Sequence, residues 1–247
     1  EKDGAEEMGL VKIDLLGNRS LAVIRDAVRD VSRTEGIPED RVIAGDPSDD
    51  PKTQDLVRRG DTFGVFYLES PAMRLLMAKA GVGDFRHAVV HSSIIRPAAN
   101  AFIEEYLLRL KGKPWEPEHE LLRGLFEESY GIPVYQEDVV RLTMKLCGYD
   151  YVEADKVRKC LGRRTAREEI GRMMPDLNTA AVAHGVTDER LPNRYETVLM
   201  SLTGSSFRQP PSARHAPVPF HSPHLRPHYT APFLPALPPH GRRPSSV

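Results

Sequence analysis

A series of short helical segments, separated by glycine and proline, constrains the fold of this chain most strongly. Helices are predicted at 118–129, 136–147, 153–161 and 166–173, and the breaks between them fall at 131–133, 148 and 162. Glycine ends a helix because it adopts left-handed backbone angles, and proline because it lacks an amide hydrogen. The pattern therefore predicts a chain in which helix dominates.

A strand is predicted near the start of the chain. Residues 10–16 alternate, Gly17 and Asn18 then break the pattern, and a helix follows Ser20, which gives a strand, a tight turn and a helix. Residues 62–68 suit either a short strand or a buried turn. Further helices are expected near Thr53, around 73–77, and from Pro97 to 112. The expected fold class is mostly α with a short β element.

The composition changes abruptly at residue 204. The last 44 residues hold 11 of the 21 prolines, 5 of the 9 histidines and no acidic residue. Proline at that density removes backbone donors, so this tail is predicted to be polyproline II or disordered rather than packed core. Residues 1–203 carry 29 basic and 35 acidic side chains, so the body of the chain is acidic.

Composition also excludes some classes of protein. No apolar stretch approaches the ~20 residues that a membrane helix requires, which excludes a membrane protein. Cys147 and Cys160 are the two cysteines, and they form no CxxC pair, which favours a reducing cytoplasm over a disulfide scaffold. The chain opens at Glu1 within an expected element, so we expect a fragment.

Lys12 and Asp14 are the first candidates for chemistry. They share one face of the predicted strand, about 7 Å apart at a rise of roughly 3.3 Å per residue. A carboxylate there could hold Mg²⁺, and a neighbouring ammonium could neutralise phosphate oxygens, as phosphoryl transfer requires. The alternative is a surface salt pair on a half-exposed strand, which stabilises by only ~0 to 1 kcal/mol.

A basic run from Lys156 to Arg172 is the second candidate. Lys156, Lys159 and Arg163 fall on one helical stripe that could face phosphates. An ordinary solvated helix face is the alternative. Arg96 lies between apolar residues and a proline, so it either pairs with a carboxylate or faces an anionic ligand, and His91 could be a satisfied core histidine.

Five stretches together resemble one family. They are LVKIDLLGNRSL (10–21), GDTFGVFYLES (60–70), HSSIIRPAAN (91–100), ESYGIPVYQEDV (128–139) and GYDYVEADKVRKCLGRR (148–164). In this order and spacing they look like the end of the palm and the fingers of the alpha subunit of bacterial DNA polymerase III, a C-family DNA polymerase. HSSIIRPAAN departs from the commoner LYRPGP form and is similar to a subgroup that includes error-prone relatives.

The resemblance implies a function and a set of site residues. The parent would be a DNA-directed DNA polymerase that extends a primer 3′ end with dNTPs on a DNA template, by Mg²⁺-dependent nucleotidyl transfer. Asp14 would be a metal-binding palm aspartate and Lys12 would contact the nucleotide phosphates. The fingers would direct basic side chains toward the triphosphate or the primer–template: Arg96, Arg158, Lys159 and Arg163. Gln136 and Glu137 would support the site.

The resemblance also implies four parts of the chain. Residues 1–33 would be the end of the palm, 34–61 a linker, 62–203 the helical fingers, and 204–247 a Pro-, His- and Arg-rich tail. HYTAPFLPAL (228–237) resembles a later segment of the family, so a reading-frame error is a second explanation of the tail. The other palm aspartates and the regions that bind duplex, clamp and replication subunits are absent here, so the isolated fragment is expected to be inactive.

Two other functional classes stay open. A non-catalytic helical nucleic-acid-binding module would use the same basic stripe for phosphates. A decayed gene product would lack a stable fold. Whether the parent replicates the chromosome or copies damaged DNA is also open.

Overall fold

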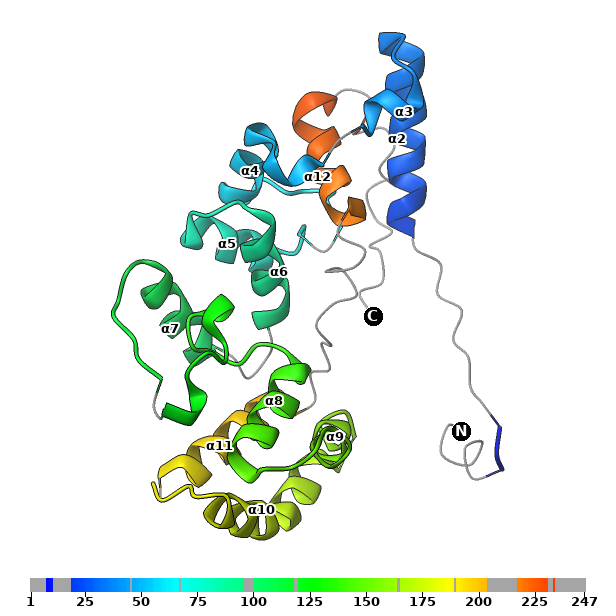
Figure 1. Ribbon diagram of the computed structural model, residues 1–247. Helices are drawn as coiled ribbons and strands as arrows, with labels where there is room; N and C mark the ends of the chain where they lie inside the picture. Colours follow the sequence, from blue (N-terminus) through cyan, green and yellow to red (C-terminus); the bar gives the residue numbers. More distant parts are fainter. Residues whose placement is uncertain are drawn as a thin grey trace. The chain divides into compact units, whose positions relative to one another are not determined.

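The computed structural model describes residues 8–10, 19–44, 46–66, 68–95, 100–117, 120–163, 165–188, 190–203, 217–230 and 233. All regular elements in these ranges are helical (Figure 1). The predicted strand at 10–16 lies largely outside them. The α-helices are α2 (Arg19–Glu35), α3 (Glu39–Val42), α4 (Pro51–Arg58), α5 (Pro71–Ala80), α6 (Phe85–Ile94), α7 (Asn100–Leu110), α8 (Gln136–Cys147), α9 (Tyr151–Cys160), α10 (Ala166–Ala183), α11 (Arg190–Leu202) and α12 (Pro217–His228). Short 3₁₀ turns are η1 (Pro47–Asp49), η2 (Glu120–Leu122) and η3 (Glu127–Ser129).

The chain divides into two compact units, residues 1–45 with 228–247, and residues 46–227. In the first unit, α2 and α3 contact each other. Ala27, Val28 and Val31 form the buried stripe of α2, at the helical spacing expected from the sequence.

Side-chain caps start four of the helices of the larger unit. Asp50, Ser70, Asp84 and Asp150 each accept a hydrogen bond from the backbone amide three residues later, at the starts of α4, α5, α6 and α9. Such caps satisfy amides that the helix itself leaves unpaired, and each stabilises by about 1 kcal/mol. Local sequence signals therefore determine where these helices begin.

Three apolar clusters pack these helices together. One joins α4, α5 and α6 around Val57, Met73 and Met77, and a second joins α5, α6 and α7 around Ile94 and Tyr106. The third and largest cluster packs α8, α9, α10 and α11 against one another. This last cluster is the scaffold of the basic run.

Several predicted elements need correction. Residues 62–66 and 68 form the buried turn rather than the strand, with Val65 and Leu68 inside. The helix predicted at 118–129 is wrong: described residues there form the turns η2 and η3, and Phe126 and Tyr130 adopt left-handed angles on either side of η3. The prolines and glycines around this segment block a continuous helix. Residues 34–61, predicted as a linker, contain α3, and also α4 at the place near Thr53 where a helix is predicted.

Helix α10 is longer than the sequence predicts. It runs through Pro175, and the last turns bury Leu177 and Ala181 in the large cluster. Proline costs a helix about 3 kcal/mol because it removes an amide donor and crowds the preceding turn. Packing of the apolar face offsets this cost, so tertiary contacts override the local break. The helices α6 and α11 are absent from the sequence-based expectations altogether.

Part of the predicted tail is helical. Helix α12 contains Pro223 and Pro227, and Leu225 is fully buried. Arg226 pairs with Asp61 at 2.9 Å, and His224 Nδ1 lies 3.6 Å from Asp50. The prediction of polyproline II or disorder is therefore not confirmed for this segment, whose backbone is helical over 217–228 and whose side chains 224–226 contact the larger unit's other residues or its core.

Candidate nucleic-acid interface

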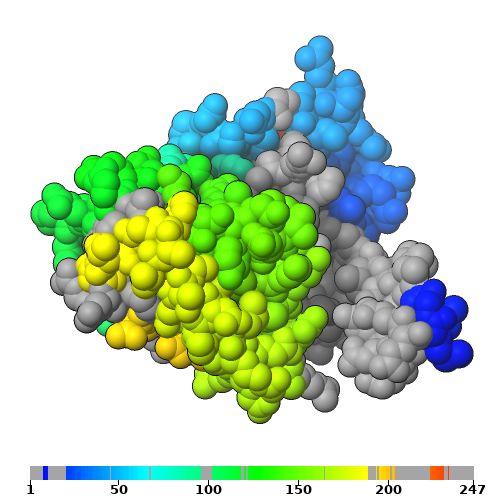
Figure 2. All heavy atoms as spheres, turned by 60° about the horizontal axis from the view of Figure 1, so that its bottom comes forward, coloured from blue at the N-terminus to red at the C-terminus, as the bar shows by residue number. Residues whose placement is uncertain are grey.

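Helix α9 positions the basic run. A capping box starts the helix: the Asp150 carboxylate accepts from the Glu153 amide at 2.8 Å, and the Glu153 carboxylate accepts from the Asp150 amide at 3.0 Å. Ala154, Val157 and Leu161 then turn into the large cluster and are fully buried. Because this inner face is fixed, the opposite face of α9 is presented to solvent. Figure 2 looks onto the surface that α8, α9 and α10 form (green to yellow-green).

Arg158 lies at the edge of the buried face. Its Nε donates to the Asp155 carboxylate at 2.6 Å, and one terminal nitrogen donates to the Gln136 side-chain oxygen at 3.3 Å. The Arg158 side chain is 17% exposed and Gln136 is buried. The guanidinium is therefore held in one orientation, between the start of α8 and the outer side of α9.

Lys159 and Arg163 are more exposed, and each has a carboxylate partner. Lys159 Nζ lies 3.0 Å from Asp155, and Arg163 lies 2.9 Å from Glu169. The hydrogen bond from Arg158, with help from Lys159, holds the pKa of Asp155 below its usual value. The hydrogen bond from Thr165 does the same for the pKa of Glu169, with Cys160 and Arg163 contributing. Both carboxylates are thus ionised and occupied near neutral pH.

Lys156 and Arg167 belong to the predicted basic run, but the resemblance gives neither of them a role in the site. Both are exposed, and neither side chain has a hydrogen bond or ion pair within the described ranges. The sequence could have identified Lys156 as a cation without an ion-pair partner, because residues 152 and 160, four positions away on either side, are Val and Cys. The carboxylate three positions earlier, Glu153, is turned back into the capping box. These two cations are free to meet an anion.

The other predicted site residues cannot be compared with this geometry. Lys12, Asp14 and Arg96 lie outside the described residues. Their predicted roles stay predictions. Of the two residues expected to support the site, Gln136 contacts Arg158 directly, and Glu137 lies beside it in the first turn of α8.

Helix α6, which leads toward Arg96, carries a buried polar cluster. The His91 ring is fully buried, with both nitrogens unpartnered among the described residues, and the Tyr106 ring packs edge-on against it at 5.6 Å. His91 is therefore a core histidine, as the sequence suggested, but its ring nitrogens have no hydrogen-bond partner among the described residues. His87 bridges Asp84 at 2.6 Å and the Tyr130 hydroxyl at 3.0 Å. Burial, with a smaller effect of His87, lowers the pKa of His91 from 6.5 to about 4.

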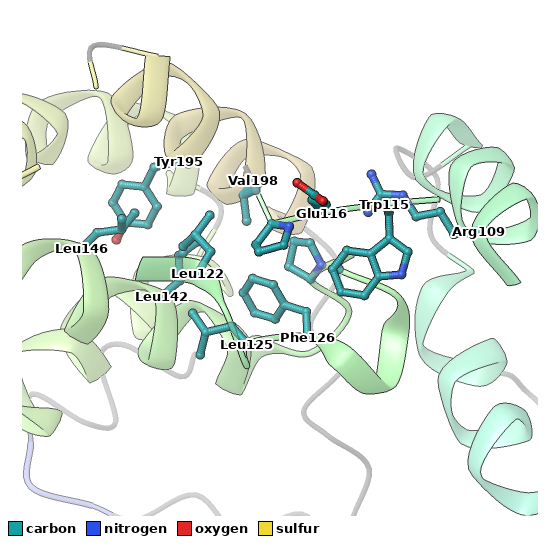
Figure 3. Close-up of a pocket in the computed structure, with 13 residues that line it drawn as sticks. Arg109, Trp115, Glu116, Leu122, Leu125, Phe126, Leu142, Leu146, Tyr195 and Val198 are labelled. Atoms are coloured by element: carbon teal, nitrogen blue, oxygen red, sulfur yellow. The ribbon is translucent and has the colours of Figure 1, made fainter. Parts of the chain in front are cut away.

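A pocket of the larger unit lies between the end of α7, η2, α8 and α11 (Figure 3). Arg109 stands over the Trp115 ring at 5.7 Å and donates to the Tyr130 carbonyl at 2.8 Å, so its charge is engaged. Leu122, Leu125 and Phe126 supply much of the remaining wall. The Tyr195 hydroxyl on this side is already hydrogen-bonded to Thr143, and an apolar wall of this kind packs helices together.

No helix within the described ranges is both long enough and apolar enough to cross a membrane.

Comparison with known proteins gives a consistent family. Residues 20–185 match the finger domain of the bacterial DNA polymerase III alpha subunit. The chain is 31% identical over 242 residues to DNA polymerase III subunit alpha of Thermus aquaticus, covering 94% of this chain and 19% of that protein. It is 31% identical over 239 residues to the same subunit of Mycobacterium tuberculosis, and 30% identical over 237 residues to that of Neisseria meningitidis serogroup A. The chain spans about one fifth of the length of these relatives. It therefore belongs to the finger-domain family of the bacterial DNA polymerase III alpha subunit.

Proposed function

We propose that this chain is the end of the palm and the fingers of a DNA-templated DNA polymerase, which extends a primer 3′ end with dNTPs during replication. One observation supports this most directly: exposed cations gather on the outer side of α9 and the start of α10, in a body that is otherwise acidic. Local positive charge of this kind attracts phosphates even where the net charge does not. Family membership makes primer–template DNA and dNTPs the phosphates concerned.

The basic side chains divide into two kinds. Arg158 is fixed by Asp155 and Gln136, yet these contacts use only part of the five N–H donors of a guanidinium. A guanidinium held in place loses little freedom on binding, which suits recognition of a triphosphate. Lys159 and Arg163 are exposed and can exchange their carboxylate partners for phosphates. Arg96 would join them from the segment after α6.

Asp14 and Lys12 would form the catalytic part. Asp14 would be a ligand of Mg²⁺, and Lys12 would neutralise phosphate oxygens of the incoming nucleotide. On the basic face, Asp155 and Glu169 are tied to cations, so the described carboxylates there do not suit a metal ion. Bound Mg²⁺ stabilises the negative charge that develops during phosphoryl transfer. Its other ligands would come from carboxylates that this chain does not contain, so the chain alone is expected to be inactive.

The test is Asp14→Asn in the full-length parent enzyme. We expect primer extension to be abolished and DNA binding to be retained, because the substitution removes a metal ligand and leaves the phosphate-binding cations intact. Asp176→Asn, an exposed carboxylate on α10, is the matched control and should extend primers normally. Normal extension by Asp14→Asn would show that this residue is not catalytic.

A non-catalytic binding module would present the same cations to phosphates. Nucleotide dependence separates the two functions. A polymerase should bind primer–template more tightly when the correct dNTP and Mg²⁺ are present, whereas a plain binding module should not respond. Salt dependence cannot distinguish them, because both contact the DNA backbone.

A further inference from the structure

Two large apolar side chains stand in solvent at the start of α9. Tyr151 is 64% exposed and Val152 is 65% exposed. They occupy the first turn of a helix whose opposite face is fully buried. Neither side chain is needed for the packing of α9, since Ala154, Val157 and Leu161 already fill that role. An exposed tyrosine in such a position is available for a partner.

The same outer face carries positive charge. Lys156 and Lys159 lie four and seven positions after Val152, so all three project on one side of the helix. Two carboxylates lie nearby, and each already has partners within α9. Glu153 is turned to the backbone at the helix start, and Asp155 is held by Arg158 and Lys159. Tyr151, one position before Val152, lies at the edge of this face, so the outer side of α9 presents an aromatic ring, an apolar contact and two ammonium groups, one of them free of partners in the described structure.

We propose that this outer face of α9 binds a single DNA strand, with Tyr151 stacked on an unpaired base and Lys156 and Lys159 on neighbouring phosphates. Aromatic side chains beside cations are the usual means of holding single strands, because every base offers a flat face and every nucleotide a negative charge. A DNA duplex fits this face less well, because it has no unpaired base on which Tyr151 could stack. An apolar protein surface also fits less well, because it would bring two ammonium groups against apolar side chains. The inference rests on the proposed function, in which the single strand is the unpaired template.

Fluorescence anisotropy of the 247-residue chain tests this inference. The probes are a fluorescein-labelled oligothymidylate of roughly 20 nucleotides and a duplex of the same length. Tyr151→Ala should weaken single-strand binding by roughly 5- to 150-fold, because alanine substitution of a stacking residue costs ~1 to 3 kcal/mol. Tyr151→Phe should retain binding, and duplex affinity should change by less than about twofold. Lys156→Gln should lower the salt dependence on the single strand by about 0.7 in slope.

Controls come from α5 of the same unit. Leu75→Ala removes an exposed apolar side chain and Lys79→Gln an exposed lysine, and both should leave single-strand affinity unchanged. The inference is overturned if the chain does not bind the oligothymidylate, or if Tyr151→Ala and Leu75→Ala behave alike. Either result leaves the proposed function standing, since that depends on extension by the parent enzyme. Loss of extension in the parent with Asp14→Asn, in turn, says nothing of Tyr151.

Discussion

The buried histidine on α6 makes the stability of the chain depend on pH in a way that a single substitution should remove. His91 is fully buried, and both ring nitrogens lack partners within the described ranges. Tyr106 faces it from α7, and the titratable neighbours on α6 and the loop before it are His87 and Asp84. The folded protein therefore keeps His91 neutral, whereas the unfolded chain protonates it at its ordinary pKa.

The magnitude follows from the two pKa values. The pKa of His91 falls from 6.5 to about 4 on folding, and each pKa unit corresponds to about 1.4 kcal/mol. The unfolded state binds the proton first, so the contribution of His91 to stability is complete above pH 6.5 and is lost as pH falls toward 4. Linkage gives a loss of about 1 kcal/mol near pH 5.5 and about 2 to 3 kcal/mol near pH 4.5.

The buried carboxyl of Asp138 affects the pH dependence of stability in the opposite direction. Burial raises its pKa to about 6, although the Val134 and Tyr135 amides each donate to it at 2.8 Å. The folded protein takes up this proton more readily than the unfolded chain, so stability from Asp138 rises as pH falls from 6 toward 3.8. The two groups partly cancel in the native protein. A comparison of the native protein with His91→Leu isolates the histidine, because Asp138 is present in both.

The assay is urea denaturation of the native chain and of His91→Leu between about pH 7.5 and 4.5. We expect the difference in free energy of unfolding to be nearly constant above pH 6.5 and then to change by about 2 to 3 kcal/mol in favour of the variant. Tyr106→Phe is the control: it removes the unpartnered hydroxyl, keeps His91, and should follow the pH dependence of the native protein. A difference that stays constant across this pH range would refute the reasoning.

Two further substitutions test backbone conformation and core packing, both by urea denaturation. Gly60→Ala should destabilise by more than about 2 kcal/mol, because its φ is +66° and an added Cβ would lie 2.3 Å from the Arg74 carbonyl oxygen. Gly81→Ala, with φ +70° and nothing within 4 Å, should cost only about 1 kcal/mol; equal costs would contradict the steric explanation. Leu177→Ala should cost about 2 to 5 kcal/mol, because Leu177 is 1% exposed in the large cluster. Exposed Val182→Ala should change stability by less than about 0.5 kcal/mol, and a similar loss at both sites would contradict the packing described.

Sequence reasoning succeeded where local signals agreed with packing. Gly148 ends α8 at φ +67°, Asp150 caps α9, and both predicted helices appear within two residues of their expected bounds. The basic stripe on α9 was also predictable, because an apolar face at helical spacing fixes which side faces solvent. These features depend on residues a few positions apart, so a single sequence is enough to identify them.

The failures arose where distant residues decide. Helix α10 continues through Pro175 because Leu177 and Ala181 pack against helices α8 and α11, which a local pattern does not reveal. The segment after Trp115 looked helical, yet Phe126 adopts φ 61° and Tyr130 φ 55° around η3. Left-handed angles in aromatic residues cost roughly 1 to 3 kcal/mol and persist only where surrounding contacts impose them. Here the Tyr130 carbonyl is held by Arg109 and its hydroxyl by His87.

Charge pairing on α9 shows why a count of basic residues finds the basic run but does not identify which of its side chains are available to bind a phosphate. Arg158 carries the same charge as Lys156, yet Asp155 three positions earlier fixes it, while the carboxylate three positions before Lys156 is consumed by the helix cap. A phosphate approaching this face must compete with Asp155 for Lys159 and meets no such competitor at Lys156 in the described structure. Neutralising Lys156 should therefore weaken DNA binding more than neutralising Lys159, although the family resemblance pointed to Lys159. The order of these two effects, measured on the same oligothymidylate, distinguishes a surface set by pairing from one set by charge density alone.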